Sequence, residues 1–120
     1  IGFRTWAGSK HHVVSGNVIR VEPDGKMGLA MDIRGTETTI TSNSIHNMQG
    51  DSLPLKITAG NAVVTGNIFE YVTLTVDDPA ESPKPVSIRN NVLENSTVVV
   101  IAGNVNQNST ESNVEHASPE

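Results

Sequence analysis

The sequence has no cysteine among its 120 residues, and aromatic residues make up only 3% of it. The absence of cysteine excludes disulfide bonds and thiolate metal sites. The scarcity of aromatic residues means that the core is not built on large rings. Acidic residues outnumber lysine and arginine by 13 to 8, which argues against nucleic acid as a partner, because nucleic-acid binders carry basic patches.

The sequence also lacks the features of a membrane protein and of a metal or cofactor site. No stretch approaches the roughly 18 consecutive apolar residues of a membrane helix, so no membrane partner is expected. The four histidines are too dispersed for a metal site, and there is no glycine-rich phosphate loop or nucleophile elbow. We therefore expect neither metal nor cofactor. The chain starts at Ile1 without a secretory signal, and we expect it to be a fragment or processed product of a longer protein.

The sequence does contain one motif that is repeated four times. It consists of an apolar residue, two small or polar residues, an asparagine, any residue, and a second apolar residue. The asparagines of the motif are Asn17, Asn43, Asn67 and Asn91. A period of about 24 to 26 residues is typical of a solenoid, in which each coil buries its apolar face against the next coil.

Each repeat reads as three short strands with tight turns between them. Val, Ile and Thr alternate with other residues at period two, and glycine or asparagine closes each run. The sequence therefore predicts an all-β fold, a parallel β-helix of about four to five coils. The coils span 1–103, with a proline-rich loop insertion at 77–85. Residues 104–120 are expected to be a polar C-terminal tail, cap or linker.

Alignment on the asparagines sorts the coils into columns, with neighbouring coils about 4.8 Å apart. Four columns are apolar throughout, and we expect them to form the interior. These columns are Val14, Ile40, Val64 and Ile88; Ile19, Ile45, Phe69 and Leu93; Met31, Leu55, Leu74 and Val99; and Ile33, Ile57, Val76 and Ile101. The asparagine column is interpreted as scaffold, because asparagine tolerates unusual backbone angles at a corner and its amide can form ladders.

One outward column carries the candidate catalytic residues. It contains Arg20, His46, Glu70 and Glu94, in that order along the solenoid. Glu70 and Glu94 should be neighbours, on the order of 5 Å apart at their roots. Two carboxylates at about 5 Å are what a retaining glycosidase uses, so both are candidate catalytic residues. The alternative is that they are solvated rim residues.

The candidate substrate-binding residues are Arg20 and His46 in this column and Asp32 and Lys56 on another strand. Asp32 and Lys56 fall in one column and are expected to pair across coils, which contributes only about 0–1 kcal/mol at a surface.

Other side chains are read from their position in the pattern. Outward Val98 and Val100 predict a contact with a partner, a folded-back tail or a second subunit. Trp6 is expected to pack at the end of the solenoid, with stacking on a sugar ring as the alternative. His12 falls on the interior side. Asp77–Asp78 is interpreted as a solvated loop start rather than a cation site.

The repeated corner, read as apolar-x-x-Asn-x-apolar, resembles that of the right-handed parallel β-helix superfamily. That superfamily includes pectate-lyase-like polysaccharide lyases and hydrolases and bacteriophage tailspikes. The resemblance covers 1–103 and implies a right-handed coil, in agreement with the rule for parallel crossovers. It also implies binding or cleavage of polysaccharide on the outside of the helix, and a homotrimer if the chain is tailspike-like. No catalytic motif of the superfamily matches residue by residue.

We therefore expect part of a phage tailspike-like or extracellular β-helix protein, located outside the cell or on the virion surface. Its expected partner is a surface polysaccharide, which the full-length protein also depolymerises if it is catalytic. The alternatives are a polysaccharide lyase or glycoside hydrolase fragment, and a non-catalytic structural adhesin shaft.

Overall fold

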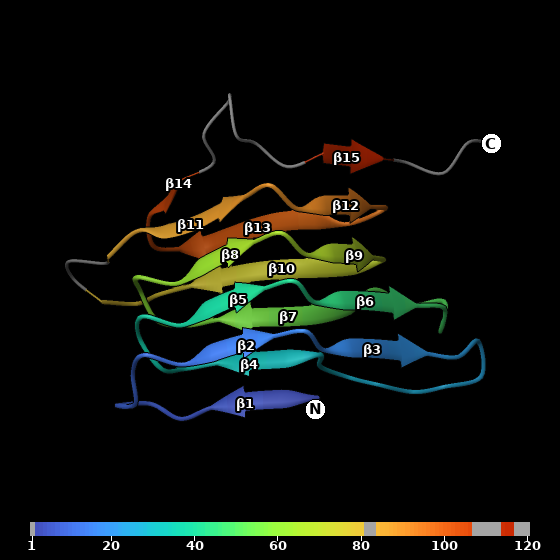
Figure 1. Cartoon of the computed structure of the whole chain (residues 1–120), viewed down its shortest axis with the longest axis horizontal. Coiled ribbons are helices and arrows are strands. Elements are labelled where there is room, and N and C mark those ends of the chain that lie inside the picture. Colours follow the sequence, from blue (N-terminus) through green and yellow to red (C-terminus); the bar gives the residue numbers. More distant parts are fainter. Residues whose placement is uncertain (1, 81–83, 107–113, 117–120) are drawn as a thin grey trace.

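The computed structural model describes residues 2–80, 84–106 and 114–116, the last three by their backbone alone. The described chain is a parallel β-solenoid of about four turns, without a helix, which confirms the predicted all-β fold class (Figure 1). Strands of successive coils pair in parallel to form three sheets of five strands each.

Each coil contributes one strand to each sheet, in the same order every time. The first sheet contains β1 (Phe3–Thr5), β4 (Met31–Ile33), β7 (Leu53–Ile57), β10 (Val72–Asp77) and β13 (Thr97–Ala102). The second contains β2 (Val13–Ser15), β5 (Thr39–Thr41), β8 (Val63–Thr65), β11 (Val86–Arg89) and β14 (Val105–Asn106). The third contains β3 (Val18–Val21), β6 (Ser44–Asn47), β9 (Ile68–Glu70), β12 (Val92–Glu94) and β15 (Val114–His116).

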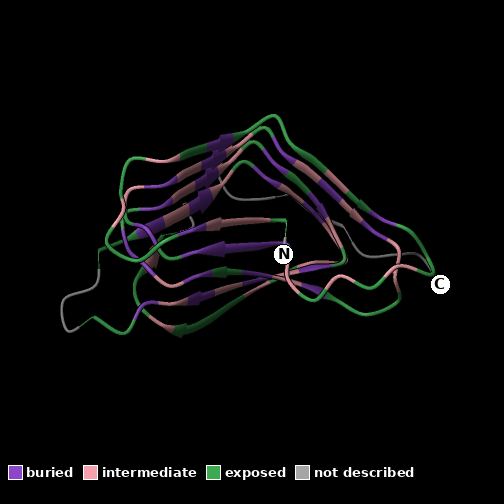
Figure 2. Ribbon diagram, turned by 90° about the horizontal axis from the view of Figure 1, so that it is seen from below, coloured by how far each residue is buried: buried purple, intermediate pink, exposed green. Residues whose placement is uncertain are grey.

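The core is a stack of mainly aliphatic side chains. Figure 2 shows the buried segments on the strands that surround one interior. Parallel register places each inward residue directly over its equivalent in the next coil, as with Ile40 over Val64 in the second sheet and Ile45 over Phe69 in the third. All four of these side chains are fully buried. The predicted interior columns are therefore correct through the first four coils, with Ile19 only partly buried at the open end.

The fifth coil corrects one part of the prediction. In β13, Val98 pairs with Leu74 and packs against the core, whereas Val99 is 41% exposed. The prediction had placed Val99 and Ile101 inside and Val98 and Val100 outside. Leu74 lies seven residues after Asn67, and its partner Val98 lies seven residues after Asn91, so β13 arrives one position earlier than the predicted alignment assumed.

Ile101 departs from the alternation for a separate reason. The register shifts after Val76, which pairs with Val100, so that Asp77 pairs with Ala102. Ile101 is thus the extra residue of a β-bulge, and it is 66% exposed.

The asparagine corner works differently from the prediction in one respect. The residue that adopts a positive φ is the one before each ladder asparagine, as at Ser42 (59°) and Gly66 (70°). The expectation that the asparagine itself takes the unusual angle is wrong for the described coils. Because the preceding residue makes the bend, the asparagine side chain is directed along the stack instead.

The predicted asparagine ladder is present and largely buried. The Nδ2 of Asn43 donates to the Oδ1 of Asn67 at 3.0 Å, and the Nδ2 of Asn67 donates to the Oδ1 of Asn91 at 2.9 Å. Each Oδ1 also accepts a backbone N–H from the preceding coil, as from Asn43 to Asn67 at 2.9 Å. The Nδ2 of Asn67 donates to the carbonyl of Ile40 as well, at 2.9 Å. These asparagines are scaffold, as expected.

The solenoid continues beyond Gly103. β14 pairs with β11, and β15 pairs with β12, so the described parts of 104–120 add a strand to the second sheet and a strand to the third. Residues 107–113 and 117–120 lie outside the described residues.

The ladder leads to a prediction about stability. Asn67→Ala removes bonds to the coils on both sides and leaves buried groups without partners, so we expect a loss of about 3 kcal/mol in the free energy of unfolding. Asn17→Ala, at the exposed end of the ladder, should cost less than about 1 kcal/mol. Urea unfolding followed by circular dichroism measures both. Equal losses of stability in the two variants would show that a buried asparagine of the ladder contributes no more than the exposed one.

Candidate functional site

The outward face of the third sheet carries the predicted column. Backbone register places Arg20 beside His46, His46 beside Glu70, and Glu70 beside Glu94. Arg20 is turned toward Glu22, with 2.8 Å between Nε and Oε1. The four residues are thus brought into one line across β3, β6, β9 and β12, and the roles assigned to them stay predictions.

Within this line, His46 and Glu70 form a specific pair. The Nδ1 of His46 lies 3.2 Å from the Oε2 of Glu70, and the two side chains are 35% and 32% exposed. The carboxylate of Glu70 is therefore oriented by an imidazole, and the remaining ring nitrogen of His46 stays available for a ligand. The predicted pair of carboxylates, Glu70 and Glu94, is therefore part of a longer row, in which Glu70 has His46 on one side and Glu94 on the other.

A hollow of about 430 Å³ opens beside this pair. It is lined by Asn47, Met48, Gly50, Glu70 and Tyr71, and we call it the Tyr71 hollow. Tyr71 is 47% exposed and forms the corner between β9 and β10 with a φ of 54°. The buried Asn47 holds this corner, because its Nδ2 donates to the carbonyl of Tyr71 at 2.9 Å. The hollow thus combines an exposed aromatic ring with the carboxylate of Glu70, whose ion-pair partner His46 lies outside the lining.

Sequence reasoning missed Tyr71. The signal was the short sequence separation between Asn67 and β10. It leaves Tyr71 as a one-residue corner between β9 and β10, which places its ring at the surface.

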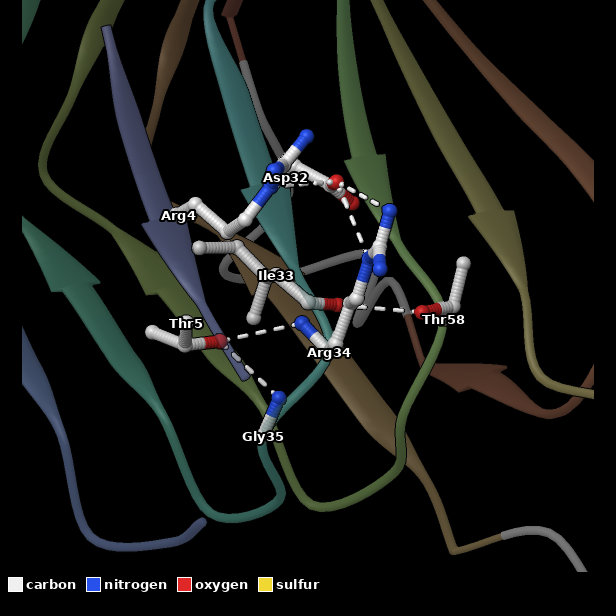
Figure 3. Close-up of polar contacts among 7 residues, drawn as sticks. All are labelled: Arg4, Thr5, Asp32, Ile33, Arg34, Gly35 and Thr58. Atoms are coloured by element: carbon white, nitrogen blue, oxygen red, sulfur yellow. Dashed lines mark hydrogen bonds and ion pairs between the residues drawn. The ribbon is translucent and has the colours of Figure 1, made fainter. Parts of the chain in front are cut away.

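The outward face of the first sheet carries a second cluster, centred on Asp32 (Figure 3). The Oδ2 of Asp32 accepts hydrogen bonds from the Nε of Arg4 at 3.1 Å and from the Nε of Arg34 at 3.0 Å. The Nη2 of Arg34 lies 2.9 Å from the same oxygen. Asp32 is only 4% exposed, so two arginines on the surface cover a nearly buried carboxylate.

The expected pair of Asp32 with Lys56 needs correction. The two residues lie opposite each other in the register of β4 and β7, as predicted. The ion-pair partners of Asp32 are nevertheless Arg4 and Arg34, since long guanidinium side chains reach the carboxylate from the preceding coil and from two positions along the strand.

The backbone beneath this cluster is fixed by a hydroxyl. The Oγ1 of Thr5 accepts hydrogen bonds from the backbone N–H groups of Arg34 and Gly35, both at 2.9 Å (Figure 3). Thr58 donates to the carbonyl of Ile33 at 3.3 Å from the other side. The end of β4 is therefore held from both neighbouring coils, which places Arg34 in a constant position.

Trp6 lies at the surface beside this cluster. Its side chain is 65% exposed, and the guanidinium carbon of Arg4 lies 5.4 Å from the centre of its ring. The expectation that Trp6 packs at the end of the solenoid is therefore wrong. Its position leaves aromatic surface open next to a cation.

The remaining candidates have structural explanations. The Oδ1 of Asp78 accepts the N–H of Ala80 at 3.2 Å, and Asp78 is buried, so the expectation of a solvated loop start is wrong for this residue. Asp77 is partly exposed and is the last residue of β10. His12 is partly buried, as its interior phase predicts, and its Nε2 has no hydrogen-bond partner among the described residues. Another hollow, of about 560 Å³, is lined by residues 23–28, 49, 51, 52 and 54, and includes no candidate residue.

Neither a metal centre nor a membrane segment is found in the described part of the chain. Among residues 2–80 and 84–106, no three potential histidine, aspartate or glutamate ligands come together. No helix long and apolar enough to cross a membrane occurs in the portion that the structure covers.

Comparison of the chain with protein-family models, with curated proteins and with solved structures finds no match.

The Asp32 cluster leads to a second stability prediction. Asp32→Asn leaves two guanidinium groups without their shared carboxylate, so the free energy of unfolding should fall by about 1–3 kcal/mol. Glu22→Gln breaks an ion pair in which both side chains are more than half exposed, and it should change stability by less than about 1 kcal/mol. Thermal and urea unfolding of the two variants make the comparison. A loss for Asp32→Asn no larger than for Glu22→Gln would contradict the expectation.

Proposed function

We propose that this chain is part of an extracellular or virion-surface β-helix protein that binds polysaccharide on the outside of its solenoid. The observation that carries the proposal is the Tyr71 hollow with the His46–Glu70 pair at its rim. A sugar presents an apolar ring face and several hydroxyl groups. An exposed aromatic ring beside oriented polar groups complements both features.

The row of outward side chains favours an extended ligand over a compact one. Arg20, His46, Glu70 and Glu94 recur once per coil along the solenoid, at the strand spacing of about 4.8 Å. A polymer lying along the third sheet meets a polar group at every coil. A small molecule meets only one or two of them.

A glycoside hydrolase or lyase is the second candidate, favoured by the adjacent register of Glu70 and Glu94. In a retaining mechanism, one carboxyl group protonates the leaving oxygen while the other attacks the anomeric carbon. Glu70, held by His46, is the carboxylate positioned to attack. Glu94 is then the proton donor, and later the base that activates water.

Binding is tested with the chain and a panel of purified bacterial capsular polysaccharides and O-polysaccharides, immobilised on a sensor surface. We expect at least one to bind, and Tyr71→Ala and Glu70→Gln to weaken that binding about tenfold or more, because each removes a contact of the hollow. Glu37→Gln is the matched control, because Glu37 also pairs with a histidine, His11, at 2.8 Å, but on a different corner. Binding that is indifferent to Tyr71→Ala and Glu70→Gln would remove the Tyr71 hollow from the binding site, and no binding to any polysaccharide would favour a structural shaft.

The same variants separate binding from catalysis. If the chain depolymerises the polysaccharide that it binds, Glu70→Gln and Glu94→Gln should each lower the release of new chain ends by at least about 100-fold. Cleavage that persists in both variants would remove this pair from the catalytic machinery.

The proposal includes self-association into a homotrimer. The exposed apolar residues of β13 are Val99, Val100 and Ile101. Of the two residues predicted to be exposed, Val100 is 47% exposed, whereas Val98 packs against the core. Large exposed aliphatic side chains in one strand are typical of a contact surface.

Sedimentation velocity at micromolar concentration tests the trimer. We expect a trimer for the unchanged chain and a monomer for Ile101→Asp, because a charge in the contact is not compensated. Ile68→Asp, an exposed aliphatic residue on the third sheet, is the control and should stay trimeric. A monomeric unchanged chain is the result that excludes the trimer.

A further inference from the structure

We infer that the outward face of β1, β4 and β7 is a binding site for an acidic sugar, formed by Arg4, Arg34 and Lys56 beside Trp6. The group recognised is an oxyanion carried on a sugar ring, either a carboxylate or a sulfate. The inference rests on the proposed function, because it names the class of polysaccharide that the solenoid binds. It concerns a different sheet from the Tyr71 hollow.

The first argument is that the two arginines are held in place before any ligand arrives. Both donate to the same Oδ2 of Asp32, which is nearly buried and therefore nearly immobile. Arg4 uses its Nε for this contact, and Arg34 uses Nε and Nη2. Among the described residues, these contacts leave terminal nitrogens of both groups for another acceptor. A guanidinium that is already oriented loses less conformational freedom when it binds, which favours affinity.

The second argument is the local charge. The chain carries a net charge of −5, yet β1, β4 and β7 contain a single acidic residue, Asp32. The basic residues of this face are Arg4, Arg34 directly after β4, and the exposed Lys56, which is in register with Asp32. Together, these four residues carry a net positive charge. A positive area on an otherwise acidic molecule attracts anions to one place.

The third argument is the exposed ring of Trp6. Arg4 lies over this ring at 5.4 Å, so the aromatic surface and the cation form one unit. A sugar that carries an acidic group needs both an apolar surface for its ring face and donors for its oxygens. Arginine supplies the donors in a planar fork that matches two oxygens of one group. A bare inorganic anion uses only the second of these features.

The test uses isothermal titration of the chain with four probes. These are a hexamer of glucuronic acid, the same hexamer with its carboxylates methyl-esterified, a sulfated galactan hexamer, and inorganic sulfate. We expect at least one acidic hexamer to bind about tenfold or more tightly than the esterified hexamer, and to weaken as salt is raised. Tighter binding of the glucuronic acid hexamer identifies the oxyanion as a carboxylate. Tighter binding of the galactan identifies it as a sulfate.

Variants locate the binding on this face. Arg4→Gln and Arg34→Gln should each weaken binding of the acidic hexamer at least about tenfold. Arg89→Gln, which removes the same charge from the second sheet, is the matched control and should leave the affinity within about twofold. Trp6→Ala should weaken binding of the hexamer and leave that of inorganic sulfate unchanged. Equal effects of Arg89→Gln and Arg4→Gln would overturn the assignment.

Asp32→Asn distinguishes a preorganised site from simple charge attraction. The substitution makes the face more positive, so attraction by charge alone predicts tighter binding. The proposed site predicts weaker binding, by several-fold, because the two guanidinium groups lose their common anchor. Tighter binding to Asp32→Asn therefore contradicts the site, and unfolding curves under the titration conditions establish that the variant is folded.

The remaining outcomes separate this inference from the proposed function. Equal binding of the acidic and esterified hexamers, unaffected by Arg4→Gln, overturns the acidic-sugar site and leaves polysaccharide binding in place. Binding of inorganic sulfate as tight as that of the hexamers overturns the recognition of a sugar. If none of the hexamers binds while a neutral polysaccharide binds at the Tyr71 hollow, the inference fails and the proposed function stands. If no polysaccharide of any kind binds, both fail.

Discussion

The register between successive coils is the constraint on which the rest of the structure depends. Because side chains alternate along a strand, a shift of one residue would move every inward side chain of a coil to the surface. The asparagine ladder opposes such a shift, since each amide contacts its equivalent in the next coil and a backbone carbonyl as well. The apolar columns, the outward row on the third sheet and the Asp32 cluster all inherit their order from this register.

Much of the fold could be predicted because stacking repeats the same environment at the same phase. Ile40 and Val64 occupy equivalent positions, and so do Asn43 and Asn67, so one alignment sorted inside from outside. The alignment failed at β13, where Val98 rather than Val99 packs against the core. β13 reads as a continuous apolar run, so its composition does not show which of its side chains point inward. The 24-residue spacing from Leu74 does identify Val98, and the predicted alignment was one residue out.

The candidate sites were only partly predictable, for a different physical reason. Register alone gives which side chains are neighbours, and it correctly placed His46 beside Glu70 and Asp32 beside Lys56. It does not give which neighbours bond. Asp32 is bonded to Arg4, the residue opposite it on β1, and to Arg34, two residues along the chain. It is not bonded to Lys56, the residue opposite it on β7. The surface position of Trp6 was missed because nothing in its flanking sequence distinguishes a covered end from an open one.

The amide-to-amide hydrogen bonds of the ladder all run in the same direction along the stack, so one coil is the repeating unit of the solenoid. In every amide-to-amide bond of the ladder the Nδ2 donor belongs to one coil and the Oδ1 acceptor to the coil that follows, so each coil offers its successor the same interface that it received. A whole coil of 24 residues, the separation of Asn43 from Asn67, is therefore a self-contained module. Gain or loss of one coil preserves the ladder, the core and the outward rows together. In evolution, the length of such a shaft is free to change by complete coils. Corners can also differ in length without a change of register, since 26 residues separate Asn17 from Asn43 and 24 separate Asn43 from Asn67.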